Sequence, residues 1–442
     1  MGHARGGGGK RKRVAASLVL LLALLGAVAV RLTTAVAPTA SRSIAVGAWP
    51  RAVAVDPATG HAFVADRGDG TVAVVDLATA RLLGKAAIGV EPWAVAIDRR
   101  TGRAFVTALA GQSVSTFDTA SGQLLRTITV GQTTGQCLVA INERVGRAAV
   151  LNCRDPSVTI LDAASGRALR TRGTPVVAGV QGLLGAVAVD DRTGHVFVGS
   201  RDAGARAIST LDARTGATLA VARVGAYPVI AADGGTGRVI VADERDTRVR
   251  VLDARSGRVW RTLTVPYPAV ALAVDERRAR VFIATWSRLG PVGSNVTGNG
   301  HVLMLDGRTG ALLRVTAVGD TPTAIAVDQG SDHVLVTTSI ADPTDPMGHV
   351  VGYGSVHVLD ATTGMALWTV PVGVAPVALA IDERTHQAVV TNAGVNTDGT
   401  PVMVRTLPAP GWLTWLHSRL PFVPLPRAAS TAGSITILDS AR

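Results

Sequence analysis

The chain has 442 residues, 49 of them glycine, with 4% aromatic residues and a formal net charge of +12. Abundant glycine together with recurring Val, Ile and Thr favours many short strands and tight turns over a helical fold. Residues 1–31 carry half of the net charge, with six basic residues and no acidic one. The remainder has no basic run of the kind that binds nucleic acid, so we expect no nucleic-acid groove.

The N-terminal 40 residues are predicted to be a targeting segment and a linker. A basic cytoplasmic region, residues 1–13, precedes the uncharged run 14–30, which is either a signal anchor or the core of a signal peptide. Ala35-Val36-Ala37 fits a cleavage site, but Pro38 would hinder the peptidase, so a membrane anchor is favoured over cleavage and secretion. Residues 31–40 form the linker. Either way the basic cluster stays inside, which predicts an extracytoplasmic protein.

From residue 41 onward one unit recurs, beginning at Pro50 and again at Pro92. Each unit has an AVAV-like stretch and a VxVLD-like stretch, both of which end in a short polar residue. The first set is Asp56, Asp98, Asn142, Asp190, Asp233, Asp275, Asp328 and Asp382, and the second is Asp76, Asp118, Asp162, Asp212, Asp253, Asp306, Asp360 and Asp439. Eight copies of each predict an all-β fold, an eight-bladed β-propeller of four-stranded antiparallel blades.

Within a unit the order is strand A, turn, strand B, loop, strand C, turn and strand D, and most turns have the form D-x-x-[T/S]-G. The eighth unit stops after strand C, whereas a D-like strand at residues 41–47, SRSIAVG, precedes the first unit. Residues 41–442 are therefore predicted to be one propeller whose N-terminal strand completes the last blade. Pairing the two ends of the chain in this way also removes an exposed sheet edge.

The x-V-G-x-x-P link, the [FV]-V-[AT] strand and the V-x-x-x-D-x-x-T-G turn resemble the YVTN-type repeat of YncE-like propellers. The resemblance spans residues 41–442 apart from three insertions, and it implies an exported bacterial β-propeller with no particular reaction. Such propellers usually have seven blades, so seven blades is the alternative to our count of eight.

In such a ring strand A lines the channel, and the B–C and D–A loops share one face, which we call the top face. The A–B and C–D turns share the bottom face, where we expect the aspartates to cap turns and not to form a cation-binding ring. The B–C loops of blades six, seven and eight carry insertions at residues 286–300, 339–354 and 392–433. Varied loops on a rigid scaffold are where binding residues tend to lie, which points to the top face.

Candidate binding residues are the aromatic and acidic side chains of the top face: Trp49, Glu91, Trp93, Tyr227, Tyr267, Trp286, Asp320, Tyr353, Trp412 and Trp415. An alternative is that the rings only cover the channel mouth and pack the insertions. Trp412 and Trp415 lie at roughly helical spacing in an apolar stretch, which predicts a binding element or lid. By contrast, one strand-B position is expected in the core: Phe63, Phe105, Phe197 and Phe282.

No catalytic or cofactor motif stands out. The strand-A cores hold no Asp, Glu, His or Asn before the bottom turn, so we expect no channel metal, although four loop acids could ring the mouth: Asp66, Glu91, Asp243 and Asp320. We expect no cofactor and a monomer. The favoured function is a non-catalytic binding or scaffold propeller for an unknown protein or cell-envelope polymer, docking near blades six to eight. The alternative is a channel-mouth enzyme, a lactonase-like hydrolase or quinoprotein-type oxidoreductase.

Cys137 and Cys153, the only cysteines, are predicted to form a disulfide because the expected compartment is oxidising and they flank one A–B hairpin. Aligned on the first unit they match Arg51 and Arg67, close to directly opposite each other. Two separate thiols are the alternative.

Overall fold

A computed structural model describes residues 41–109, 111, 113–130, 138–152, 157–173, 184–200, 206–287, 299–339, 353–394 and 433–439. The regular elements in these ranges are strands, and no helix there could cross a bilayer. The predicted targeting segment and linker, residues 1–40, lie outside the described residues. All described strands belong to one compact unit, Ala40–Ala441.

Each blade runs from an innermost strand A to an outermost strand D. Blade 1 is β2 (Pro50–Asp56), β3 (His61–Asp66), β4 (Thr71–Asp76) and β5 (Arg81–Ala87). Blade 2 is β6 (Pro92–Asp98), β7 (Arg103–Ala108), β8 (Ser113–Asp118) and β9 (Leu124–Thr129). Blade 3 is β10 (Val139–Asn142), β11 (Arg147–Asn152), β12 (Ser157–Asp162) and β13 (Ala168–Gly173). Blade 4 is β14 (Leu184–Asp190), β15 (His195–Ser200), β16 (Ala207–Asp212) and β17 (Thr218–Arg223).

Blade 5 is β18 (Pro228–Asp233), β19 (Arg238–Asp243), β20 (Arg248–Asp253) and β21 (Val259–Thr264). Blade 6 is β22 (Ala269–Asp275), β23 (Arg280–Ser287), β24 (Asn299–Asp306) and β25 (Leu312–Gly319). Blade 7 is β26 (Thr321–Asp328), β27 (His333–Ser339), β28 (Tyr353–Asp360) and β29 (Ala366–Val374). Blade 8 is β30 (Pro376–Asp382), β31 (Gln387–Asn392), β32 (Ser434–Asp439) and β1 (Arg42–Ala45).

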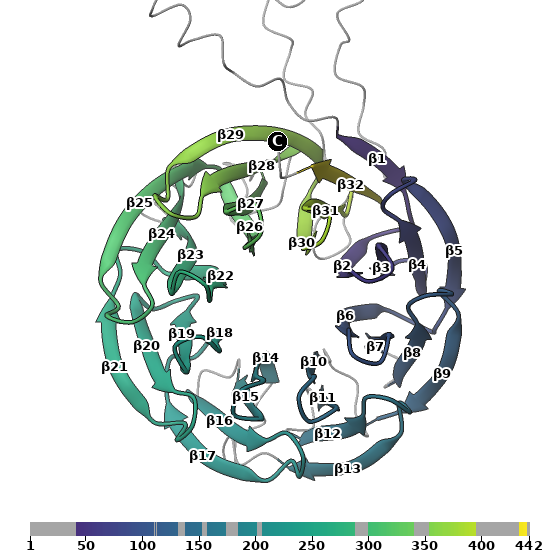
Figure 1. Cartoon of the computed structure of the whole chain (residues 1–442), viewed down its shortest axis with the longest axis horizontal. Helices are drawn as coiled ribbons and strands as arrows, with labels where there is room; N and C mark the ends of the chain where they lie inside the picture. The colour runs from purple at the N-terminus through teal and green to yellow at the C-terminus, as the bar shows by residue number, and fades with distance from the viewer. Residues whose placement is uncertain are drawn as a thin grey trace, which may run out of the picture. The chain divides into compact units, whose positions relative to one another are not determined.

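The eight antiparallel sheets form a ring in which strand A of every blade lies nearest the axis and strand D lies outermost (Figure 1). This confirms the prediction of eight blades over seven. The innermost strands carry half-buried residues such as Ala54 and Ala96, so solvent reaches the axis of the ring. The four phenylalanines predicted for the core, Phe63, Phe105, Phe197 and Phe282, are fully buried.

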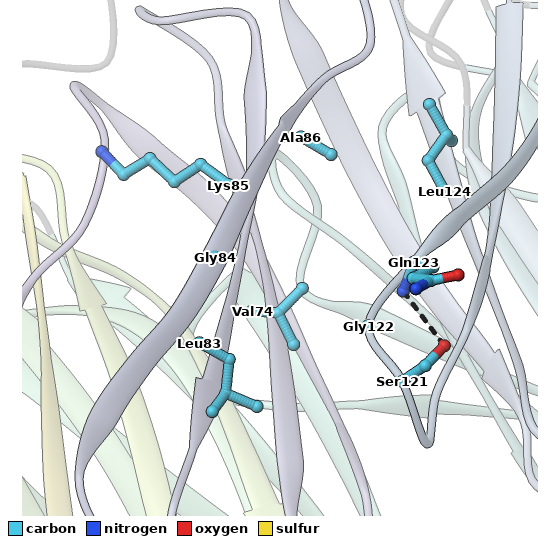
Figure 2. Close-up of a pocket in the computed structure, with 9 residues that line it drawn as sticks. All are labelled: Val74, Leu83, Gly84, Lys85, Ala86, Ser121, Gly122, Gln123 and Leu124. Atoms are coloured by element: carbon cyan, nitrogen blue, oxygen red, sulfur yellow. Dashed lines mark hydrogen bonds between the residues drawn. The ribbon is translucent and has the colours of Figure 1, made fainter.

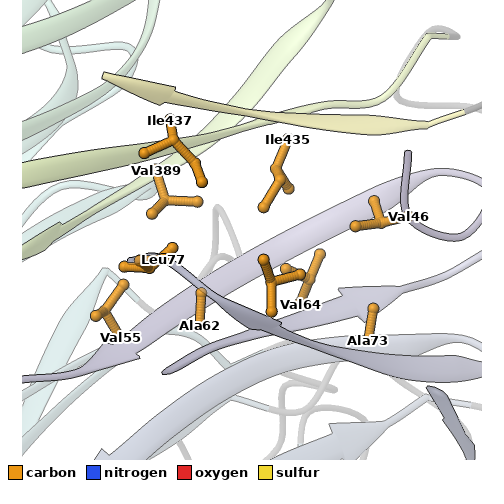
Figure 3. Packing of buried hydrophobic residues seen from close by; sticks show 10 residues of the cluster. Val46, Val55, Ala62, Val64, Ala73, Leu77, Val389, Ile435 and Ile437 are labelled. Atoms are coloured by element: carbon orange, nitrogen blue, oxygen red, sulfur yellow. The ribbon is translucent and has the colours of Figure 1, made fainter. Parts of the chain in front are cut away.

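The N-terminal strand closes the ring as predicted. Strand β1 pairs antiparallel with β32 from Arg42 opposite Ile437 to Ala45 opposite Ser434. The next residue, Val46, is buried in a cluster that includes Val389 and Ile435 of blade 8 and Val64 of blade 1 (Figure 3). One short N-terminal segment therefore completes blade 8 and also packs against blade 1.

Aspartate caps hold the bottom-face turns. In the A–B turn of blade 2, Asp98 is fully buried and accepts hydrogen bonds from the Arg100 backbone N–H at 3.1 Å and from Thr101 Oγ1 at 2.6 Å. In the C–D turn of blade 3, Asp162 Oδ1 accepts the N–H and the hydroxyl of Ser165, both at 2.9 Å. The Ser165 N–H bond helps to lower the pKa of Asp162, so its carboxylate is ionised and engaged in its own turn.

The bottom face is also tied together from blade to blade, which sequence analysis did not predict. Arg384 Nε donates to the Pro57 carbonyl at 2.8 Å across the junction of blades 8 and 1, and Arg144 Nε donates to the Asp191 carbonyl at 2.6 Å between blades 3 and 4. Arg99 of blade 2 reaches Glu383 of blade 8 at 2.9 Å. These contacts tie the turns of different blades together, so many polar groups of this face are bonded within the protein.

Candidate binding face

One position near the top end of strand B is buried in every blade and polar in all blades but the second: Asp66, Ala108, Asn152, Ser200, Asp243, Thr285, Thr338 and Asn392. These side chains position the loops above them. In blade 5 the Asp243 carboxylate accepts the Tyr227 N–H at 2.9 Å and the Arg245 N–H at 2.8 Å, which joins the D–A loop to the B–C loop. In blade 5 this buried polar residue therefore supports the loops of the top face.

Asp66 differs from the other residues at this position. It is fully buried beside the backbone of Gly47, whose N–H bonds to it, and Thr71 Oγ1 donates to its Oδ2 at 3.4 Å. Burial raises the pKa of Asp66 to about 7, because removing a carboxylate from water disfavours its charged form. This carboxyl group therefore titrates near neutral pH at the point where the N-terminal strand joins blade 1.

Trp93 and two arginines meet on the top face between blades 1 and 2. Trp93 occupies the extra residue of a β-bulge between Pro92 and Ala94, and Arg51 occupies the equivalent bulge of blade 1. The Arg51 guanidinium lies 4.2 Å and that of Arg67 5.3 Å from the centre of the Trp93 ring, within cation–π distance. Arg67 also pairs with Glu91 at 2.9 Å. Two of the predicted site residues, Glu91 and Trp93, thus belong to one cluster.

A second cluster lies on blade 5, where the Arg245 guanidinium sits 4.0 Å from the centre of the Tyr227 ring. Asp246 in the same loop pairs with Arg248 at 2.7 Å. Arg250 approaches Asp246 at 4.0 Å, and burial lowers the pKa of the Arg250 guanidinium. Tyr227 is therefore half-buried under a charged loop.

On blade 6 Tyr267 stacks on His301, with ring centres 4.7 Å apart and planes at 16°. Trp286 lies half-buried on the adjacent strand. Strands β23 and β24 continue their pairing beyond Thr285–His301, through Trp286 opposite Gly300 to Ser287 opposite Asn299. The pairing in blade 1 ends at the equivalent of Thr285–His301, so the hairpin of blade 6 rises two residue pairs higher over the top face.

The remaining candidates are spread over the same face. Tyr353 opens the long strand β28, pairs with Val374, and is 40% exposed. Asp320 is half-buried, and burial raises its pKa. Trp49 packs against the cluster of Val374, Ala375 and Ala393 at the junction of blades 8 and 1. The structure therefore gathers Glu91 with Trp93, but it places Tyr227, Tyr267 and Trp49 in separate local settings.

Three D–A loops share a strained backbone directly before proline: Trp49, Glu91 and Ala375 have φ of 53°, 60° and 52°. Left-handed φ is unusual for residues with a side chain. In each loop the carbonyl of this residue accepts an N–H from the chain just beyond strand B, with donors at 2.9 to 3.0 Å: Arg67, Leu109 and Ala393. The unusual backbone conformation thus accompanies a hydrogen bond that recurs in these three loops. It does not by itself indicate a ligand site.

Sequence reasoning missed the partners in these clusters: Arg51, Arg67, Arg245 and His301. The repeat alignment already placed Arg51 and Trp93 at one position, but only the ring brings the two strands A side by side. Of the loop acids considered for an entrance metal, Asp66 and Asp243 are buried under the loops and Glu91 is bound to Arg67. In the part of the chain that the structure describes, no three His, Cys, Asp or Glu residues converge to hold a metal ion.

Trp412, Trp415, Cys137 and Cys153 lie outside the described residues, as do most of the three insertions. In blade 1, Arg67 lies opposite Trp49 and not opposite Arg51, because its N–H donates to the Trp49 carbonyl at 3.0 Å. The matched positions are thus further apart along the strands than sequence alignment suggested. The disulfide stays a prediction. Alkylation before and after reduction should give different masses if the bond forms, and equal masses would show two free thiols.

No protein-family model matches the sequence, and no curated protein matches it significantly. The computationally designed protein Ika8 matches with a TM-score of 0.57 and 19% identity, over 80% of this chain and 96% of the design. BamB from Moraxella catarrhalis matches with a TM-score of 0.55 and 16% identity, over 80% of this chain and 96% of BamB.

The dihydro-heme d1 dehydrogenase NirN, solved in complex with DHE, matches with a TM-score of 0.55 and 14% identity, over 72% of this chain and 65% of NirN. These three likenesses show the propeller fold. They do not show that the chain belongs to the YncE-like family, which stays a resemblance based on the repeat. At such low identities they give no evidence about activity.

Proposed function

We propose that this protein is an extracytoplasmic, non-catalytic binding propeller that captures a protein or a cell-envelope polymer on its top face, around blades six to eight. The observation that carries the proposal is the lengthening of the strands there. Strands β23 and β24 of blade 6 extend two residue pairs beyond the blade-1 pattern, and β28 of blade 7 begins with the exposed Tyr353. The insertion of blade six therefore leaves from a hairpin that is two residue pairs longer than that of blade 1. In blade 7 the extra length of β28 pairs with the outer strand β29, where Tyr353 lies opposite Val374.

The difference between the two faces supports this choice. On the bottom face, aspartates cap their own turns and arginines tie neighbouring turns together, as Arg384 does with Pro57. On the top face of blade 6, by contrast, half-buried rings gather: Tyr267 is stacked on His301, and Trp286 lies on the adjacent strand. Tyr and Trp combine large apolar area with a polar tip, and they are enriched where proteins recognise partners.

Capture experiments with the exported chain test the proposal. The partner found with the wild type should be lost when residues 395–432 are removed, a deletion that keeps the paired and buried residues at both ends of the insertion. The exchange Tyr353→Ala should weaken its affinity roughly 30-fold, the loss typical of a central aromatic contact. Trp260→Ala is a matched control, because Trp260 is a similarly exposed aromatic on the outer wall of blade 5. Capture that survives both changes on blades seven and eight with unchanged affinity would contradict a binding face there.

A further inference from the structure

The outer strands carry large apolar side chains that face solvent in a regular pattern. Each outer strand from blade 1 to blade 7 has a large apolar residue that is 44% to 52% exposed among its first three residues. These residues are Leu83, Leu125, Leu169, Leu219, Trp260, Leu313 and Leu367. The neighbouring Leu82, Leu124, Val259 and Leu312 are exposed as well. Because each outer strand starts directly after a C–D turn, these side chains encircle the bottom edge of the propeller. We call this band, with the C–D turns, the outer rim.

Apart from the aspartates that cap the turns, the charged residues of the outer rim are basic. Strands β5, β9, β13, β17, β21, β25 and β29 contain no Asp or Glu, and their basic residues are all exposed. Five of them lie within the first three residues of their strands and so belong to the outer rim: Arg81, Arg126, Arg170, Arg261 and Arg314. The other three lie further towards the top face: Lys85, Arg172 and Arg223. The aspartates that begin the C–D turns bond within the turn, and Asp118 and Asp162 also pair with Arg103 and Arg147 at 2.6 and 2.9 Å. The inner A–B turns, by contrast, mix Glu143, Glu276 and Glu383 with their arginines.

Grooves between neighbouring blades give this rim depth. Between β5 and the C–D turn of blade 2 lies a groove of about 360 Å³, with Val74 at its base (Figure 2). Leu83 points to the same side as the tip of that turn, towards the bottom face, in Figure 2. The equivalent groove one blade further on, lined by Leu125 and Arg126, measures about 240 Å³. The outer rim therefore carries apolar and cationic side chains beside grooves that separate neighbouring blades.

The start of the propeller lies on this same edge. Arg42, the first residue of β1, donates from Nη2 to the Leu77 carbonyl at 3.3 Å in the C–D turn of blade 1. The sequence that precedes it contains the uncharged run 14–30, which is predicted to enter a membrane, joined by residues 31–40. Ten linker residues reach at most about 35 Å. The chain therefore tethers the outer rim, and not the top face, close to any bilayer that holds the N-terminal run.

We propose that the outer rim docks on an anionic lipid bilayer, so that the propeller rests on the membrane surface by its bottom edge. Exposed leucines insert at the level of the headgroups, and the arginines attract lipid phosphates, the combination by which peripheral proteins bind membranes. A soluble polyanion would be attracted by the arginines alone and would leave the ring of leucines without a role. The proposal is independent of a top-face partner, because it concerns the opposite side of the molecule.

The test uses the full chain reconstituted in vesicles of phosphatidylcholine alone or with roughly 30% phosphatidylglycerol, at which the surface potential becomes strongly negative. The tether is the same in both, so a difference in hydrogen exchange reports contact of the propeller itself. We expect slower exchange in β9, β13 and β17 on the anionic vesicles, with unchanged exchange in the inner strands β6 and β10. Adding salt should reverse the effect, because it screens surface charge.

Two variants separate the apolar from the charged contribution. The triple exchange Leu125→Ser, Leu169→Ser and Leu219→Ser should remove the protection. The triple exchange Arg126→Gln, Arg170→Gln and Arg314→Gln should also remove it, with roughly a fivefold loss of surface partitioning for each arginine. None of these six side chains belongs to a buried cluster of the described chain, so folding should persist. The matched control is Val90→Ser, since Val90 is 62% exposed but lies in a top-face loop.

Three results would overturn the proposal. The first is equal exchange of the outer strands on both kinds of vesicle. The second is equal protection by inorganic polyphosphate without lipid and without dependence on the leucines, which would assign the rim to a polyanion. The third is protection in detergent that grows with protein concentration, which would assign the rim to a second copy of the chain.

Discussion

A chain that starts at Ala48 should fail to form a stable propeller, whereas a chain that starts at Ser41 should be as stable as the full-length protein. The seven residues between these starts hold all of β1, which pairs over four residues with β32. Without it, the backbone of β32 becomes an unpaired edge, and blade 8 keeps three strands. Sheet edges of this kind are templates for association between chains.

The loss extends beyond the pairing because the N-terminal segment is also core. Val46 is 7% exposed in the cluster that joins blade 8 to blade 1 (Figure 3). Ile44 packs against this cluster. Burying Val46 stabilises the protein by about 1.5 to 3 kcal/mol, the half-buried Ile44 adds a part of such an amount, and Arg42 adds its bond to the Leu77 carbonyl. The sum is a large fraction of the whole stability of a typical domain, about 5 to 15 kcal/mol.

Thermal and denaturant unfolding of the two truncated chains measures this effect. We expect the chain from Ala48 to unfold at a much lower temperature or to aggregate, and its hydrogen exchange to increase first in β32 and β31. Adding a peptide of residues 41–47 should partly restore stability, because it can occupy the open edge. Equal melting temperatures for the two chains would show that the ring does not depend on this strand.

The contribution of Asp66 to the stability of the propeller should fall as the pH rises from about 4 to about 7, and the exchange Asp66→Asn should remove this contribution to the pH dependence. The pKa of Asp66 is about 7 in the folded protein, above its ordinary value of 3.8. The folded state therefore holds a proton that the unfolded chain releases between these values. Because the unfolded state binds fewer protons in that window, the free energy of unfolding decreases as the pH rises.

The size of this effect follows from the shift. A pKa difference of about three units corresponds to at most about 4 kcal/mol of stability. This stability is lost by about pH 7, and the contribution of Asp66 is nearly constant at higher pH. The buried carboxyl lies beside Gly47, so its ionisation weakens the attachment of the N-terminal strand that closes the ring. At pH 8 we expect Asp66→Asn to be more stable than the wild type, and at pH 4 to lose that advantage.

Urea unfolding at several pH values measures this difference. The control is Asp69→Asn, which changes a partly exposed carboxylate in the same loop and should leave the pH dependence in place. If wild type and Asp66→Asn keep a constant difference in stability from pH 4 to pH 8, folding does not raise the pKa of Asp66 and the expectation is wrong.

The amino-acid sequence by itself determined the number of blades, the order of strands and the strand that closes the ring. These features depend on local rules: alternating apolar residues form strands, and Asp and Gly at set spacing form the turns between them. Each rule repeats eight times, so an error in one unit is visible against the others. The same alignment identified Phe63, Phe105, Phe197 and Phe282 as core, and the structure buries all four.

The candidate binding face was predicted less completely. The sequence indicated which side carries the varied loops and named Glu91, Trp93, Tyr227 and Tyr267 on it. It could not show that Arg51 and Arg67 lie over Trp93, or that His301 stacks on Tyr267. These contacts join different strands or neighbouring blades, so they depend on the curvature of the ring and on bulges such as that at Arg51.

For residues whose burial does not follow the repeat pattern, only the tertiary structure decided which are buried and which are exposed. Asp66 and Asp69 stand three residues apart in one loop, yet only Asp66 is enclosed, because Gly47 from the far N-terminus covers it. Leu83 and Leu125 look like ordinary strand residues in sequence, and only their place on outermost strands leaves them in solvent. Local patterns specify strands and turns. Burial depends on which distant segment of the chain packs over each side chain, and closure of the whole ring determines that packing.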